Sequence, residues 1–153
     1  MRLAGDIDGS FKPFIDKYFE TYPLLKERVT FLGRIDERKK LAEEYKRAKI
    51  FALPSSVEGG APNVIAEALF SGCVIAVSDI DAYEDCIDGG KCGKVSKTGD
   101  AKDFARSLVE LCYAPNLREM SESAKEYAKE KFDMKKIVDE VYAKVIDIRE
   151  GIE

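Results

Sequence analysis

The chain has 153 residues, 45% of them apolar and 35% charged, and this length and composition suit one globular domain with a buried core. Its 25 Lys and Arg against 29 Asp and Glu give a net charge of −4 without a long run of one sign, so neither nucleic acid nor an anionic membrane is an expected partner. It has no histidine and no pair of cysteines separated by two residues, so we expect no metal site.

Short apolar runs alternate with amphipathic stretches in the first two thirds of the chain, a pattern typical of a parallel sheet with crossover helices. The expected strands are 2–5, 29–33, 50–54, 73–78 and 93–97, separated by helices near 10–22, 36–48, 62–71 and 81–87. The middle three strands lack polar alternation, so they should be covered on both faces. Helical spacing then predicts three terminal helices, at about 100–113, 116–131 and 134–149.

The last of these helices carries an apolar stripe that should pack across the sheet, formed by Ile137, Val141, Val145 and Ile148. Neither a repeat nor a linker occurs in the sequence, so we expect residues 1–153 to form a single domain.

The cysteines favour a reduced protein. Cys73 and Cys112 lie in apolar runs and should be buried, while Cys86 and Cys92 flank a turn where they could pair, although reduced thiols are favoured. The first residues lack the apolar core of a signal peptide, and no apolar run reaches 18 residues. These features predict a cytoplasmic protein without a membrane span.

The stretch "SSVEGGAPNVIAEALFSG", residues 55–72, places a glycine loop between the third strand and the next helix, which is where open parallel sheets bind ligands. Pro62 fits the first helical turn, and the amides of Asn63, Val64 and Ile65 then stand at the positive end of the helix, which suits phosphate. Gly59 and Gly60 permit positive φ and a close approach of ligand to backbone.

Two carboxylates, Glu58 and Glu67, flank this loop. Carboxylates repel phosphate but accept hydrogen bonds from hydroxyls, so the ligand that fits combines phosphate with polyhydroxy groups, as a nucleotide sugar does. The alternative is an ordinary turn before a helix with Glu67 as an exposed surface residue, and the residues alone leave both interpretations open.

Three runs resemble the carboxyl-terminal, donor-binding domain of the large retaining glycosyltransferase family that contains bacterial mannosyltransferases and sucrose synthases. They are "RVTFLGRID" (28–36), "AKIFALPSSVEGGAPNVIAEALFSGCVIAVSDI" (48–80) and "EDCIDGGKCGKV" (84–95). The resemblance implies a UDP-, GDP- or ADP-sugar donor, no further cofactor and no obligatory metal.

By this resemblance Glu58 would contact the donor sugar as the catalytic glutamate and Glu67 the ribose, while loop amides from Gly59, Gly60 and Ala61–Val64 would hold the diphosphate. Gly33, Arg34 and Ile35 match the segment that lines the nucleotide base. The alternative for "GRID" is an ordinary strand exit leading into a helix cap, and both interpretations remain open.

The chain departs from the family pattern at two points. Eight residues stand between Glu58 and Glu67, where the family usually has seven, so the loop is expected to bulge. The family domain also begins with a further strand and helix that carry a glycine-arginine pair and a lysine, and it is preceded by an acceptor domain. We therefore expect a truncated domain that works with a missing acceptor domain or a partner chain, and exposed sheet edges make a homodimer possible.

The resemblance also implies a strand order. The family order is 3-2-1-4-5-6, and closure of the sheet after loss of the first strand gives 2-1-3-4-5 in this chain's count, a doubly wound α/β fold. Asp6 and Asp8 would then stand beside the glycine loop, as a turn and helix cap in solvent or around a divalent cation, and we prefer the former.

Two functions remain open, a donor-binding half of a glycosyltransferase and a catalytically inert nucleotide-binding or protein-interaction module of the same fold. A phospho-acceptor signalling domain is rejected because the third strand exits as "LPSS", without an aspartate.

Overall fold

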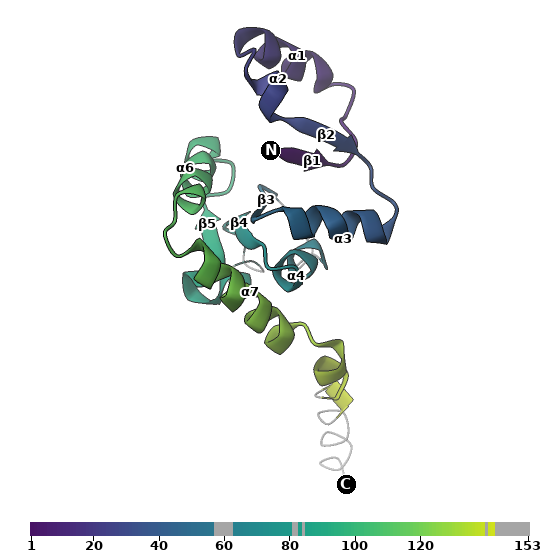
Figure 1. Cartoon of the computed structure of the whole chain (residues 1–153), viewed down its shortest axis with the longest axis vertical. Coiled ribbons are helices and arrows are strands. Elements are labelled where there is room, and N and C mark those ends of the chain that lie inside the picture. Colours follow the sequence, from purple (N-terminus) through teal and green to yellow (C-terminus); the bar gives the residue numbers. More distant parts are fainter. Residues whose placement is uncertain (57–62, 81–82, 84, 140, 143–153) are drawn as a thin grey trace. The chain divides into compact units, whose positions relative to one another are not determined.

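The computed structural model describes residues 1–56, 63–80, 83, 85–139 and 141–142. The chain divides into two compact units, Met1–Glu43 and Glu44–Glu153. Figure 1 shows the course of the chain and the labels of its elements. Each unit is described by itself.

The first unit is a βαβ unit with a two-stranded parallel sheet. Its elements are β1 (Arg2–Ala4), α1 (Lys12–Thr21), α2 (Leu25–Arg28) and β2 (Thr30–Gly33), followed by the start of α3 (Arg38–Arg47). Arg2 pairs with Thr30 and Leu3 with Phe31, and the register shifts after Leu3. None of residues 1–43 is buried, so this unit owes little to a core of its own.

An exposed row of aromatic rings runs along α1. Phe11, Phe14, Tyr18 and Tyr22 follow one another at helical spacing, with ring centroids 6.4, 5.1 and 5.8 Å apart. Each ring is between 49% and 61% exposed. The turn before α1 is held by Asp8, whose carboxylate accepts hydrogen bonds from the Ser10 amide (2.8 Å) and hydroxyl (2.6 Å). These bonds lower the pKa of Asp8, in agreement with the expected turn in solvent.

The second unit contains a three-stranded parallel sheet in the order β3-β4-β5. Its elements are β3 (Ile50–Leu53), α4 (Asn63–Phe70), β4 (Val74–Ser78), the 3₁₀ segment η1 (Asp85–Gly90), β5 (Gly93–Ser96), α6 (Ala101–Cys112) and α7 (Leu117–Lys131). Ile50 pairs with Val74 and Ile75 with Gly93, without a shift along either ladder.

The core of this unit surrounds β4, all five residues of which are buried. Val74 and Ala76 pack with Leu111 of α6 and Met120 of α7. Side chains alternate along a strand, so Ile75 and Val77 point to the opposite face. Helix α4 also contacts β4 and packs against α7. Helices on both faces of a parallel sheet make the unit doubly wound.

Strands β4 and β5 approach each other closely at Gly93. A Cβ atom at this position would lie 2.2 Å from the carbonyl oxygen of Ile75, so no side chain fits there. At the other end of β5, a buried hydrogen bond between the Ser96 and Ser107 hydroxyls (2.8 Å) links this strand to α6. Glycine here sets the spacing of the sheet.

The predicted α/β class with parallel strands is confirmed, but the single five-stranded sheet is not found. Among the described residues the strands form two sheets, β1-β2 and β3-β4-β5, so the predicted neighbours match within each unit while no ladder joins β1 to β3. The prediction of one domain for residues 1–153 stays a prediction.

Several local predictions differ from the structure. Only β4 of the three apolar strands is fully covered, because β3 is an edge of its sheet and β2 has a single strand neighbour. The four-residue helix α2 was not predicted. Of the helix expected at 81–87, residues 81, 82 and 84 lie outside the described part of the chain, and η1 begins at Asp85. Of the expected terminal stripe, Ile137 and Val141 are 37% and 55% exposed, and Val145 and Ile148 lie outside the described residues.

All four cysteines are free, as predicted, but Cys112 is exposed rather than buried because it lies on the outer face of α6. Within the part of the chain that the structure describes, no helix is both long and apolar enough to cross a membrane.

Candidate functional site

The predicted glycine loop follows β3 and leads into α4, as the sequence indicates. Its central residues lie outside the described part of the chain: Glu58, Gly59, Gly60, Ala61 and Pro62. Asn63 begins α4 and is exposed, and Val64 is half-buried. The first amides of a helix have no intrahelical acceptor, so the start of α4 has the properties expected of an anion site.

Glu67 lies on α4 and is exposed, in contrast to its neighbours Ile65, Ala68 and Leu69, which are buried. Tyr45, from the part of α3 in the second unit, is buried. Burial, followed by the negative charge of Glu67, raises the pKa of Tyr45, so the phenol stays protonated.

The Tyr45 side chain is fixed by its surroundings. It is 8% exposed and is the buried residue of an otherwise polar helix. Its ring lies 5.7 Å from that of Phe51 on β3, tilted by 58°. The thiol of Cys73 donates to the backbone carbonyl of Tyr45 at 3.3 Å. Strand β3 and the residue before β4 therefore hold Tyr45 in place.

Sequence reasoning missed Tyr45. A lone aromatic residue in the polar sequence "RKKLAEEYKR" of α3 is the signal that could have found it, because an apolar ring on such a helix has to be covered.

The predicted base-lining residues belong to the first unit. Gly33 ends β2 with φ of 64°, a conformation that favours glycine. Arg34 is exposed and pairs with Asp36 through Nε and Oδ1 at 2.6 Å, and Ile35 is half-buried. Such an exposed pair contributes little to stability, so the Arg34 side chain can exchange its partner for another one.

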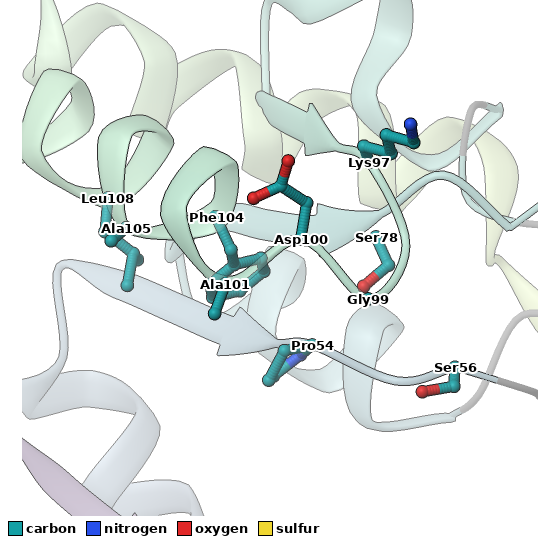
Figure 2. A pocket seen from close by; sticks show the side chains of 10 residues that line it. All are labelled: Pro54, Ser56, Ser78, Lys97, Gly99, Asp100, Ala101, Phe104, Ala105 and Leu108. Atoms are coloured by element: carbon teal, nitrogen blue, oxygen red, sulfur yellow. The ribbon is translucent and has the colours of Figure 1, made fainter.

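A cavity of about 320 Å³ opens at the carboxyl ends of the strands in the second unit (Figure 2). None of the predicted site residues in the described part of the chain lines it. The cavity is lined by Pro54 and Ser56 after β3, Ser78 of β4, Lys97, Gly99 and Asp100 after β5, and Ala101, Phe104, Ala105 and Leu108 of α6. Applying the position rule to the fourth and fifth strands as well as the third would have indicated this part of the edge.

The loops after β4 and β5 are tied together next to this cavity. The Asp79 carboxylate accepts a hydrogen bond from the amide of Thr98. Hydrogen bonds from the side chain and backbone of Thr98 hold the pKa of Asp79 below its usual range. The carboxyl edge of the sheet is thus built from two connected strand exits.

Metal-binding side chains do not gather in the described residues: no group of three or more His, Cys, Asp or Glu occurs there in an arrangement that could hold an ion. The Asp79 carboxylate next to the cavity instead accepts a hydrogen bond from the backbone amide of Thr98.

Residues 2–113 match the family described as glycosyl transferases group 1. The phosphatidyl-myo-inositol mannosyltransferase of Mycobacterium leprae is 27% identical over 117 residues, which are 76% of this chain and 31% of that protein. An uncharacterised glycosyltransferase of Methanocaldococcus jannaschii is 28% identical over 124 residues, covering 80% of this chain and 31% of its own length. The chain thus spans about a third of the length of these relatives.

Solved structures share the fold. The Anabaena protein HepE in complex with UDP superposes with a TM-score of 0.75 at 17% identity, covering 95% of this chain and 40% of its own. The sucrose-phosphate synthase of Thermosynechococcus elongatus gives a TM-score of 0.77 at 22% identity, covering 96% and 38%. At these identities the likeness is one of fold.

Proposed function

Because the chain belongs to the group 1 glycosyl transferases, we propose that it binds the nucleotide-sugar donor of such an enzyme. The donor is a UDP-, GDP- or ADP-sugar. Together with the missing acceptor domain or a partner chain, this chain transfers the sugar to an acceptor with retention of configuration.

The observation that carries this proposal is the position of Glu67. Its exposed carboxylate stands one turn into α4, four residues after Asn63 and on the same helix face. The start of that helix suits phosphate, and a carboxylate one turn away suits the hydroxyls of a ribose attached to it. This arrangement of an anion site followed by a hydroxyl acceptor supports a nucleotide as the ligand.

The proposed roles follow the sequence. Glu58 contacts the donor sugar and is the catalytic glutamate, and Glu67 contacts the ribose. The amides from Gly59 to Val64 hold the diphosphate, and Gly33, Arg34 and Ile35 line the base. The Anabaena protein HepE, which shares this fold, was solved in complex with UDP, and this supports a nucleotide as the ligand.

Calorimetric titration with UDP, GDP, ADP and their sugars tests the proposal. We expect one of these nucleotides to bind, and Glu67→Ala to weaken its binding by about tenfold or more, since a hydrogen bond to a charged group is lost. Glu130→Ala, which removes an exposed carboxylate from α7, is the matched control and should leave binding unchanged.

Failure of every nucleotide and nucleotide sugar to bind at millimolar concentration would contradict the proposal. Binding that is unaffected by Glu67→Ala would remove the ribose role of Glu67. Binding by a full assembly that never transfers sugar would instead favour the inert nucleotide-binding module.

A further inference from the structure

The cavity at the carboxyl edge of the second unit has a buried hydroxyl in its floor. Ser78, the last residue of β4, is 3% exposed. Val74 and Ala76 pack against α6, and because side chains alternate along a strand, Ser78 faces α6 as well. It lines the cavity, and Figure 2 shows its hydroxyl oxygen directed toward the side of Pro54 and Phe104. A molecule that enters the cavity therefore meets this hydroxyl.

The Ser78 hydroxyl has no hydrogen-bond partner among the residues that the structure describes. Its neighbour across the ladder, Ser96, is also buried, but the Ser96 hydroxyl donates to that of Ser107 at 2.8 Å. A polar group that is removed from water without a partner costs free energy, and native structures rarely leave one in this state. Ser96 is thus satisfied within the protein, whereas Ser78 is open to a partner that the cavity admits.

The walls around this hydroxyl are apolar. Helix α6 lines one side with four apolar side chains, and Pro54 after β3 lines another. The charged groups of Lys97 and Asp100 also belong to the lining, but in Figure 2 they point away from Ser78. The Asp100 carboxylate accepts hydrogen bonds from the first amides of α6 instead. The cavity therefore offers one neutral hydrogen-bonding group within apolar walls, a combination typical of small-molecule sites.

We propose that this cavity binds a small neutral molecule that consists of one apolar ring and one hydroxyl group, with the ring against Phe104 and the hydroxyl hydrogen-bonded to Ser78. The volume of about 320 Å³ is sufficient, since a cavity of about 150 Å³ holds a benzene molecule. A neutral ligand fits better than an ion, because an ion against apolar walls lacks a compensating charge. The residues that form this site differ from those proposed for the nucleotide, so the inference stands apart from the proposed function.

The test uses two ligands that differ by one hydroxyl, p-cresol and toluene. Each is titrated into ¹⁵N-labelled protein and followed by NMR through the amide resonances of Ser78, Gly99 and Phe104. We expect both to bind the unmodified chain with dissociation constants of about 1 mM, as suits molecules of this size. Ser78→Ala should weaken binding of p-cresol about fivefold, the effect of one hydrogen bond. Toluene should bind this variant at least as tightly as it binds the unmodified chain.

Ser107→Ala is the matched control, since it removes a buried hydroxyl that is bonded within the protein rather than open to the cavity. It should leave the affinities for both ligands unchanged. Ala105→Leu keeps a good helix former and places a larger side chain in the cavity lining, so it should abolish binding of both ligands. Circular dichroism checks that each variant is folded.

Three results would overturn the inference. The first is that neither ligand shifts the three resonances up to its solubility limit. The second is that p-cresol binds Ser78→Ala as tightly as the unmodified chain, and the third is that binding persists in Ala105→Leu. Should Ser78→Ala not fold, Ser78→Cys takes its place, because a thiol is a much weaker hydrogen-bonding group than a hydroxyl.

Discussion

At the scale of single residues, the four cysteines differ in exposure, and exposure decides their chemistry. Cys73 and Cys92 are completely buried, and burial raises the pKa of each thiol to about 11. Cys112 is exposed on α6. The thiolate is the reactive form of cysteine. A buried thiol with a raised pKa is therefore both inaccessible to reagents and rarely ionised.

We predict that N-ethylmaleimide labels Cys112 rapidly in the folded protein, whereas Cys73 and Cys92 react only after denaturation. Mass spectrometry of peptides from native and denatured samples measures this. Because the folded pKa values are raised above the ordinary value of 9.0, these thiols should also destabilise the folded protein as pH rises above 9.0. Labelling of Cys73 at the rate of Cys112 would contradict the burial.

At the scale of elements, α6 was predictable because its start signal is local. Asp100 precedes the helix in an extended conformation, and its carboxylate accepts hydrogen bonds from the amides of Lys102 and Asp103, each 3.0 Å long. This is an N-cap, and it satisfies two amides that the helix itself cannot.

Asp100→Ala should lower the free energy of unfolding by about 1 kcal/mol, the usual effect of losing an N-cap. Urea denaturation followed by circular dichroism measures the change. Asp100→Asn, which keeps an accepting oxygen, is the control and should stay close to the unmodified chain. An alanine variant as stable as the asparagine variant would show that the cap contributes nothing.

Other elements were less predictable for physical reasons. The helix expected at 81–87 is predicted to end at the turn "DGG", where Asp88 and Gly89 adopt φ of 47° and 61° inside η1, and residues 81, 82 and 84 lie outside the described part of the chain. The four residues of α2 are too few to show a period.

At the scale of the whole molecule, the two units differ in how much they bury. None of residues 1–43 is buried, whereas the second unit encloses all of β4. The elements on either side of the glycine loop, β3 and α4, were predictable because an apolar run and a helix start locate them, and the α/β class followed from the alternation of apolar and amphipathic segments. The number of sheets was not predictable, because pairing between strands distant in sequence leaves no local signal.

We predict that backbone amides of β1 and β2 exchange with deuterium earlier than those of β4. Strands with few buried contacts open at lower free energy than core strands. Hydrogen exchange followed by mass spectrometry measures the difference, with peptides from 2–4 and 30–33 compared with 74–78. Equal protection of the two sets would mean that the first unit is stabilised by contacts beyond its own elements.

The two glycines at strand positions also constrain evolution differently. Gly33 needs a positive φ but has open space around its Cβ position, so asparagine, which tolerates that conformation, is an accessible replacement. Gly93 stands against the Ile75 carbonyl, where any side chain meets backbone. Asparagine at position 33 therefore needs no movement of the neighbouring residues, whereas any side chain at position 93 requires β4 and β5 to move apart first.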